Sequence, residues 1–407
     1  MAKTKDVPVF GNLKGLKVLS TGSVVAEPYA ATLMAEFGAT VIQLESTISP
    51  DSVRAIKYGW AQEHRNELAL ALNIPSPEGR EIFLKLIKWA DVFMESSKGG
   101  TYKAWGLTDE VLWEYNPKLV IVHVSGFGQT GVQSYVERAS YDAIGQAFGG
   151  YMYINGMPEP NPPLRAGPYT CDYFTALFAA WTALAAYINA ERTGKGESID
   201  LAQFEVMQRI QLHYPGNYLN EGKLLERQGN DDPMFAAYTV FRCKDGVYVM
   251  IGFAGGGVMK RGLPFLGLDK DPDFPEGIQL TFRGSPAGIK LEKAIKDYCD
   301  THTGLEVEQG FMTVGVPCNR VYNFEMAVND PHYQAREVFT EWDDPKLGKV
   351  KGVNIIPKFE KNPGKIWRGS PLYGWDNDDI LGELGYNQEQ IAELYEKKII
   401  KKDKSLM

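Results

Sequence analysis

Residues 16–44 read LKVLSTGSVVAEPYAATLMAEFGATVIQL, a segment that predicts a strand, a helix and a second strand. The strand signals are the apolar runs at residues 16–19 and 40–44. Residues 28–37 have the apolar spacing of a helix that ends at Gly38. Two strands joined by a helix run parallel in one sheet and are connected by a right-handed crossover. We therefore expect a parallel sheet.

The alternation of helix and strand continues beyond residue 44. Apolar patterning predicts helices at residues 77–89, 109–115, 141–149 and 172–189. It predicts strands at residues 91–94, 118–124 and 198–201. This order is typical of a Rossmann-like, doubly wound α/β domain. We expect this large domain to occupy residues 1–222.

A different pattern begins after residue 222. Residues 238–243 and 247–252 are strand-like and flank Asp245-Gly246, a pair that predicts a β-hairpin turn. We expect a smaller α+β domain over residues 223–330, followed by a C-terminal segment over residues 331–407. The lysine-rich stretch near the end of that segment is expected to be solvated and frayed.

Composition and spacing exclude several classes of protein. The 407 residues are 44% apolar and 23% charged, with a net charge of −8, so we expect a globular protein without a nucleic-acid or anionic-membrane partner. No signal peptide or membrane span is apparent, so a cytoplasmic location is expected. The four cysteines lack CxxC spacing and the five histidines lack HExxH spacing, so no metal is expected. The first βα turn lacks the G-x-G-x-x-G pattern, which argues against a nicotinamide cofactor.

The remaining candidate for chemistry is a carboxylate, Asp172, at the start of an apolar helix. Aspartate is a preferred helix N-cap, so spacing alone favours a capping role. A nucleophilic role is the alternative, and the residue pattern by itself leaves both open.

The sequence resembles the class III CoA-transferases, in the branch that contains carnitine CoA-transferase and bile-acid CoA-transferase. The resemblance rests on ordered matches at residues 16–19, 26–28, 36–42, 90–99, 116–120, 125–131, 172, 193–198 and 366–369. It implies a Rossmann-like large domain formed by both ends of the chain, a small domain inserted between them, and an interlocked homodimer. It also implies an enzyme whose substrates are an acyl-CoA and a free carboxylic acid.

The resemblance assigns residues to the site. Asp172 matches the family's nucleophile, which would form an acyl anhydride and then an aspartyl-CoA thioester. Tyr141 and Asp142 precede it in a motif beside the nucleophile, where Asp142 is expected either to cap a helix or to orient Asp172. Coenzyme A is expected to contact Val24, Val25, Arg65, Asn66, Lys98, Lys103 and Arg138.

Two positions depart from the family pattern. Glu27 places a charge where relatives have the glycine of an Ala-Gly-Pro motif. Trp105 lies in a stretch where relatives place an arginine, so that Lys103 is the nearest cation. Both departures affect the expected contacts with coenzyme A.

Other functions were weighed against CoA transfer. An acyl-CoA racemase would need an acid–base pair, and Tyr141 stands where racemases have histidine; its phenol is a poor base at neutral pH. A non-catalytic CoA-binding protein is a further alternative. The resemblance, closest to the bile-acid enzyme at residues 141–148 and 342–345, implies an acceptor acid that is like a bile acid or carnitine. Tyrosines at residues 151, 153, 169 and 173 could form either a cation–π cage or an ordinary aromatic wall.

Overall fold

The computed structural model describes residues 7–406, which form two compact units. Of these residues, the large unit comprises 7–151, 166–211 and 336–406, and the small unit comprises 152–165 and 212–335. The expected fold class is confirmed, because helices cover both faces of a six-stranded parallel sheet and a smaller α+β unit is inserted in the chain. The expected domain division differs in detail, since residues 152–165, 212–222 and 331–335 fall in the small unit.

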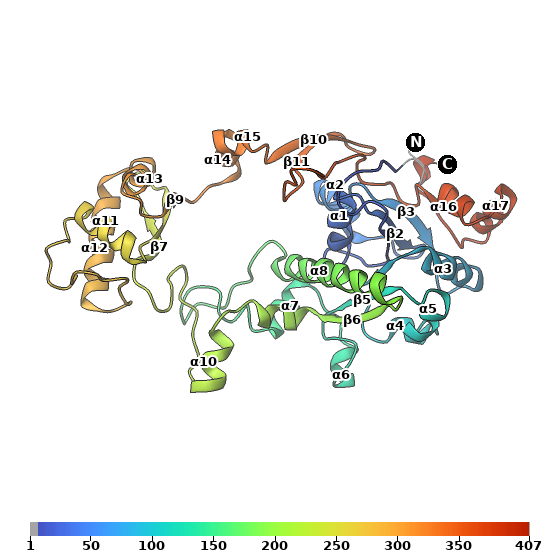
Figure 1. Ribbon diagram of the computed structural model, residues 1–407, viewed down its shortest axis with the longest axis horizontal. Coiled ribbons are helices and arrows are strands. Elements are labelled where there is room, and N and C mark those ends of the chain that lie inside the picture. Colours follow the sequence, from blue (N-terminus) through green and yellow to red (C-terminus); the bar gives the residue numbers. More distant parts are fainter. Residues whose placement is uncertain (1–6, 407) are drawn as a thin grey trace. The chain divides into compact units, whose positions relative to one another are not determined.

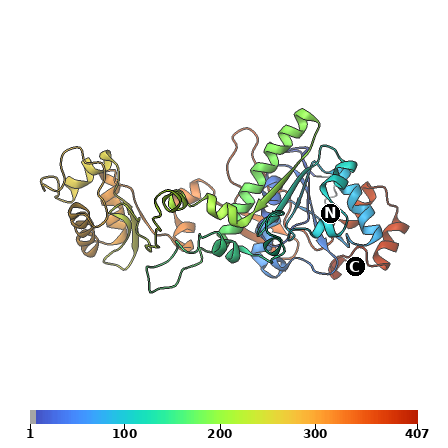
Figure 2. The ribbon, with the colours of Figure 1, turned by 90° about the horizontal axis from the view of Figure 1, so that it is seen from below.

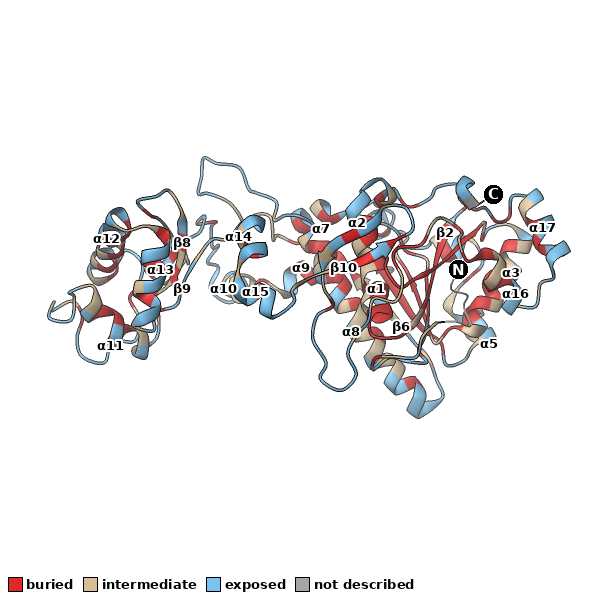
Figure 3. Cartoon of the chain, turned by 90° about the horizontal axis from the view of Figure 1, so that it is seen from above, coloured by how far each residue is buried: buried red, intermediate tan, exposed pale blue. Residues whose placement is uncertain are grey.

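The sheet of the large unit has the strand order β3-β2-β1-β4-β5-β6, with all neighbours parallel. The strands are β1 Lys17–Ser20, β2 Thr40–Ser46, β3 Leu68–Leu72, β4 Val92–Glu95, β5 Val120–Ser125 and β6 Glu197–Ala202. Successive residues of β4 point to opposite faces, so that Val92 packs on one side and Phe93 on the other. The inner strands are buried on both faces, as is usual in parallel sheets (Figure 3).

The two faces of the sheet carry different helices (Figures 1 and 2). One face packs against leucine- and isoleucine-rich helices, and the other against alanine-rich α1 and α8. The helices of this unit are α1 Pro28–Glu36, η2 Ser52–Ala55, α2 Lys57–Glu63, α3 Pro77–Trp89, α4 Thr101–Ala104, α5 Asp109–Tyr115, α6 Gln133–Val136, α7 Asp142–Phe148, α8 Thr170–Thr193, α9 Gln203–Arg209, α16 Asn377–Glu383, α17 Gln388–Glu396 and η3 Lys404–Leu406. A hairpin of β10 Phe339–Asp344 and β11 Gly348–Val353 completes it.

Helix α8 positions the candidate nucleophile. Ala176, Ala179 and Ala183 follow one face of the helix and are buried against the sheet. These small side chains let the helix approach the strands closely. By length and composition α8 is also apolar enough to cross a membrane, and within the described residues it is the one helix that meets this test. Here it forms part of the core of the large unit.

The small unit is built on the predicted hairpin. Strands β7 Tyr238–Arg242 and β8 Tyr248–Gly252 pair antiparallel, and β9 Cys318–Arg320 adds to β8. Its helices are α10 Tyr214–Glu221, α11 Gly256–Phe265, α12 Pro286–Thr301, α13 Gly304–Thr313, α14 Phe324–Asn329 and α15 Pro331–Ala335. The sheet and helices α11 to α13 share one apolar core.

The C-terminal segment covers the edge of the large sheet at β3. The Asp376 carboxylate accepts the Ala69 N–H at 2.8 Å, and the Asn377 amide oxygen accepts the Ala71 N–H at 3.0 Å. Ile400 forms a bridge to Leu72 and is fully buried. The expectation of a frayed lysine-rich end is therefore wrong, because the isoleucines between the lysines pack into the core.

Candidate active site

A cavity of about 220 Å³ lies at the carboxyl ends of the central strands. It is lined by the loops that follow β1, β4 and β5, at residues 23–26, 96–98 and 124–126. The strand order reverses between β1 and β4, and ligands of open α/β sheets bind at such a switch point. This cavity is therefore the candidate active site.

Asp172 reaches the cavity from the first turn of α8. Its side chain is buried, and the Gln203 amide donates a hydrogen bond to Asp172 Oδ1 at 2.6 Å. Gln203 is itself oriented by the Ser140 hydroxyl, which donates to Gln203 Oε1 at 3.1 Å. The residue preceding α8 is Tyr169, so the alternative that Asp172 caps its helix is wrong. Its carboxylate is directed at Gln203 and the cavity.

Asp142 lies behind Asp172 at the start of α7 and is 3% exposed. Its Oδ1 accepts the backbone N–H of Cys171 at 2.8 Å and that of Asp172 at 3.4 Å. Its Oδ2 accepts the Gln146 amide at 2.9 Å. Asp142 thus caps α8, the helix of Asp172, instead of its own helix. The expectation that it caps the helix it begins is therefore wrong, and the orienting role stays a prediction.

Burial changes the protonation of Asp172. Burial and, to a smaller extent, the negative charge of Asp142 raise the pKa of Asp172 to about 7, against the opposing hydrogen bond from Gln203. Asp172 is therefore about half ionised at neutral pH. A rise in pH increases the fraction in the nucleophilic carboxylate form.

The loop after β1 forms another wall of the cavity. Val24 has a φ of 72°, a conformation that costs a β-branched residue about 1–3 kcal/mol. Its N–H is bound by the Asp51 carboxylate at 2.8 Å, and the Ser23 N–H is bound by the Ser96 hydroxyl at 3.0 Å. Neighbouring loops thus hold the strained segment in place.

Two of the expected cations face the cavity. Lys98 and Arg138 line it and are exposed, and the Arg138 guanidinium lies 3.7 Å from the centre of the Tyr135 ring. Lys103 is exposed on α4, outside the residues that line the cavity. Val24, Val25 and the exposed Tyr141 also line it. The structure therefore brings six of the ten expected residues to the cavity, and Asp142 lies directly behind it.

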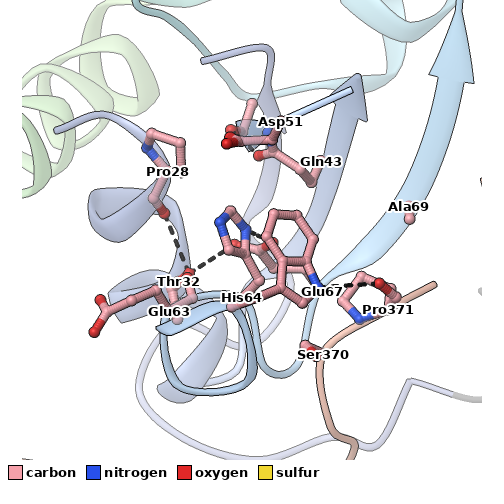
Figure 4. Close-up of polar contacts among 12 residues, drawn as sticks. Pro28, Thr32, Gln43, Asp51, Glu63, His64, Glu67, Ala69, Ser370 and Pro371 are labelled. Carbon is pink, nitrogen blue, oxygen red and sulfur yellow. Dashed lines mark hydrogen bonds and ion pairs between the residues drawn. The ribbon is translucent and has the colours of Figure 1, made fainter. Parts of the chain in front are cut away.

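Arg65 and Asn66 lie in a buried turn away from the cavity. Arg65 is ion-paired with Glu36, its Nε donating at 2.6 Å, and it packs on the Trp342 ring. Asn66 binds backbone groups of the C-terminal segment. Figure 4 shows His64 and Glu67 of the same turn paired in the interior beside Thr32. Arg65 and Asn66 were expected to line the CoA site. Their placement corrects that expectation, because both bind the C-terminal segment instead.

A second cavity of about 390 Å³ adjoins the first and shares Ser23 and Ser97 with it. It lies beyond the ends of β2 and β3, and its walls include Asn73, Tyr102 and Trp105. Among the described residues, histidine, cysteine and carboxylate side chains form no group that could hold a metal ion.

Comparison with known proteins identifies the family. The pattern of CoA-transferase family III matches residues 13–377. The chain belongs to this CoA-transferase family. It is 49% identical over 392 residues to the bile acid CoA-transferase BaiK of Clostridium scindens, covering 95% of this chain and 89% of that protein.

Solved structures agree with the family assignment. A CAIB/BAIF family protein from Brucella suis matches with a TM-score of 0.78 and 28% identity, covering 92% of this chain and all of the other. Rv3272 from Mycobacterium tuberculosis shares the fold at a TM-score of 0.78 and 20% identity, covering 91% of this chain and 99% of the other. The protein is a CoA-transferase, an enzyme that acts on CoA thioesters and carboxylic acids.

Sequence reasoning missed Gln203, the hydrogen-bond donor to Asp172. A signal for it existed, because Gln203 directly follows β6 and polar residues at the carboxyl ends of parallel strands face the ligand site. Ser140 was overlooked as well, and no spacing rule connects it with Gln203.

Proposed function

We propose that this CoA-transferase moves coenzyme A from an acyl-CoA to a free carboxylic acid with Asp172 as the covalent nucleophile. The observation that carries the proposal is the geometry of Asp172, a buried carboxylate that faces a cavity at the switch point and is held by Gln203. Within this cavity's lining, Asp172 is the one carboxylate.

The proposed reaction keeps the thioester energy through two covalent forms. An Asp172 oxygen attacks the thioester carbonyl, the C–S bond breaks, and an anhydride and a CoA thiolate result. The thiolate attacks the Asp172 carbonyl carbon and releases the donor acid as a carboxylate, leaving an aspartyl-CoA thioester. The acceptor carboxylate attacks the carbonyl carbon of that thioester, its C–S bond breaks, and a second anhydride and a CoA thiolate result. The thiolate then attacks the acceptor's acyl carbon, which yields the new acyl-CoA and frees the Asp172 carboxylate.

Coenzyme A is too long for the cavity of about 220 Å³ alone. We propose that its thioester end lies at Asp172 and that its nucleotide end extends into the adjoining cavity past Ser23 and Ser97. Lys98 and Arg138 would then neutralise phosphate charge, since charged contacts to phosphate are strong. Exclusion of water from the Asp172 end would protect the anhydride from hydrolysis.

The acceptor proposed first is a bile acid, because BaiK is a bile acid CoA-transferase and is 49% identical. A carnitine-like acid is the second candidate. Activity with each acid, measured with one acyl-CoA donor, ranks the two classes. A homodimer is also proposed for the active enzyme, and its mass in solution tests it.

The test of the mechanism uses Asp172→Ala and Asp172→Asn. Both should lose about three orders of magnitude in turnover, because removal of a covalent nucleophile is not compensated elsewhere. Asn keeps an acceptor for Gln203, so its loss isolates nucleophilicity from folding. Asp91→Asn is a matched control, because Asp91 binds the Lys17 N–H at the amino ends of β1 and β4, opposite the cavity. Near-normal turnover in either Asp172 variant contradicts the mechanism.

Trapping adds a direct readout of the same carboxylate. Incubation of the wild type with acyl-CoA and hydroxylamine should convert Asp172 into a hydroxamate detectable by peptide mass. Modification of a different carboxylate would redirect the assignment. Exchange of the acyl-CoA α-proton with solvent, without an acceptor acid and without transfer of CoA, would instead favour a racemase.

A further inference from the structure

Glu27 is a buried carboxyl group that the proposed reaction does not use. It directly follows the cavity-lining residues 23–26 and has no exposed surface. Within residues 7–406 its Oε1 has no hydrogen-bond partner, and its Oε2 lies 3.1 Å from the Ser20 hydroxyl oxygen. A side-chain carbon on Gly22 would lie 1.7 Å from Glu27 Oε2, so the carboxyl group packs directly against the other end of the loop.

The hydrogen bonds around Ser20 favour one protonation state of Glu27. The Gln43 amide donates to the Gly22 carbonyl at 2.9 Å, and since that carbonyl only accepts, the amide oxygen of Gln43 must face Ser20. Ser20 has one hydroxyl proton, which it donates to this amide oxygen. Its oxygen is then left to accept a proton from Glu27. The contact between Glu27 and Ser20 is therefore a donor–acceptor pair when Glu27 is a neutral acid.

The resulting chain runs from Glu27 to Ser20, to Gln43 and to the Gly22 carbonyl. Its two ends are the residues that bracket the cavity-lining stretch 23–26, which includes the strained Val24. This chain of hydrogen bonds therefore connects Gly22, at the start of the loop, with Glu27, at its end.

The charges around Glu27 favour the neutral form. The ionisable groups that act on it are Glu67 before β3 and Glu95 at the end of β4, both acidic, and Tyr102 of α4 faces the same region. Glu67 is paired with His64. Burial, followed by the smaller effects of these two carboxylates, raises the pKa of Glu27 to about 8, against opposing hydrogen bonds with the Ser20 side chain and the Gly22 backbone.

We propose that Glu27 is a positioning residue that, as a neutral hydrogen-bond donor, holds the loop of residues 22–26 in its CoA-binding shape. The inference rests on the proposed function, in that this loop is taken to contact acyl-CoA. Loss of the Glu27 proton removes the donor of the contact with Ser20 and so breaks the hydrogen-bond chain there. Coenzyme A binding should then weaken as Glu27 ionises.

The experiment measures the affinity of the full chain for free coenzyme A by calorimetry from neutral to alkaline pH. In the wild type the apparent Kd should rise by up to about tenfold per pH unit above the Glu27 pKa of about 8, because the binding-competent fraction falls. Glu27→Gln supplies an amide donor to Ser20, so its affinity at neutral pH should stay within about twofold and its extra alkaline loss should vanish. Asp91→Asn should keep the wild-type profile. Identical alkaline losses in wild type and Glu27→Gln overturn the proposal.

Infrared difference spectra of the ligand-free proteins give a second readout that depends neither on CoA nor on turnover. The wild type minus Glu27→Gln spectrum at neutral pH should contain the carbonyl band of one neutral carboxylic acid, and the band should disappear at alkaline pH. Absence of that band overturns the proposal. Asp172 and Glu63, whose pKa values are raised to about 7, contribute to both spectra and cancel in the difference. Failure of the nucleophile assignment would instead be seen as an active Asp172→Ala variant with an unchanged infrared band.

Discussion

Replacement of Asp142 by asparagine should make the enzyme less stable and, relative to its own maximum, more active in acid. Asp142 accepts the Cys171 N–H that begins α8, and an asparagine oxygen can keep that contact. The asparagine NH2 group would then face the Gln146 amide, which already donates to Asp142 Oδ2. Gln146 cannot turn over freely, because its own oxygen accepts the Ala166 N–H. Two donors would meet, at a cost of about 1–3 kcal/mol.

The kinetic effect follows from the charge that is removed. With a pKa of about 7, Asp172 is about one-tenth ionised one pH unit lower. Loss of a neighbouring carboxylate lowers such a pKa by roughly one unit, which would leave Asp172 half ionised at the same pH. The rate at about pH 6, expressed as a fraction of the alkaline plateau, should therefore increase about fivefold. Burial is unaffected, so the pKa of Asp172 should remain above its ordinary value.

The shift is measured by single-turnover acylation of Asp172 at a series of pH values on the acid side of the pH–rate profile. Release of CoA is the signal, and no acceptor acid is present. Chemical unfolding of the same samples measures the stability loss. An acid limb that stays at the wild-type position, or moves to higher pH, would falsify the electrostatic coupling of the two aspartates. A variant of unchanged stability would contradict the expected conflict between the new amide donor and the Gln146 amide.

Three further outcomes are expected. Gln203→Leu removes the hydrogen bond that lowers the pKa of Asp172, so the acid limb should move above about pH 7, opposite to Asp142→Asn, and a pH–rate profile checks this. Lys98→Ala and Arg138→Ala should each raise the KM for acyl-CoA about tenfold, less at high salt, whereas Lys103→Ala, outside the cavity lining, should change it little in steady-state kinetics. Between the ordinary Glu27 pKa of 4.5 and about 8, the folded wild type holds a proton that the unfolded chain loses, so the stability of the wild type falls as pH rises. The stability difference between Glu27→Gln and wild type should therefore grow by about 1.4 kcal/mol per pH unit in this range. A difference that does not depend on pH in urea unfolding would refute this expectation.

Elements with strong local signals were predictable from sequence. Helices Pro77–Trp89 and Asp109–Tyr115 have the predicted bounds, and the Ser76 hydroxyl caps the first of them. Strand β3 was missed because its sequence LALAL consists of good helix formers. Its extended state comes from pairing with β2 and from burial on both sides, which are tertiary effects.

The site was predictable in type but only partly in geometry. Asp172 was found through its resemblance to a family motif, and the structure explains its position by a contact 30 residues away in sequence, from Asp142 to the Asp172 N–H. Glu27 stood out as a departure, yet its burial beside Ser20 and Gln43 depends on the packing of two strands. Arg65 resembled a phosphate ligand, because a sequence cannot show that Glu36 neutralises it inside the protein.

The covered edge of β3 has a consequence for the order of biosynthesis. During translation, the strands β1 to β6 leave the ribosome long before Asp376, Asn377 and Ile400, the residues that satisfy the edge of β3. Until then the nascent sheet presents an apolar strand with free N–H groups, a surface prone to pair with other chains. A stop codon placed just before residue 376 should therefore yield aggregated protein, although it removes none of the residues that line the cavity. The residues that pair with the edge of β3 are thus synthesised only after all the residues that line the cavity.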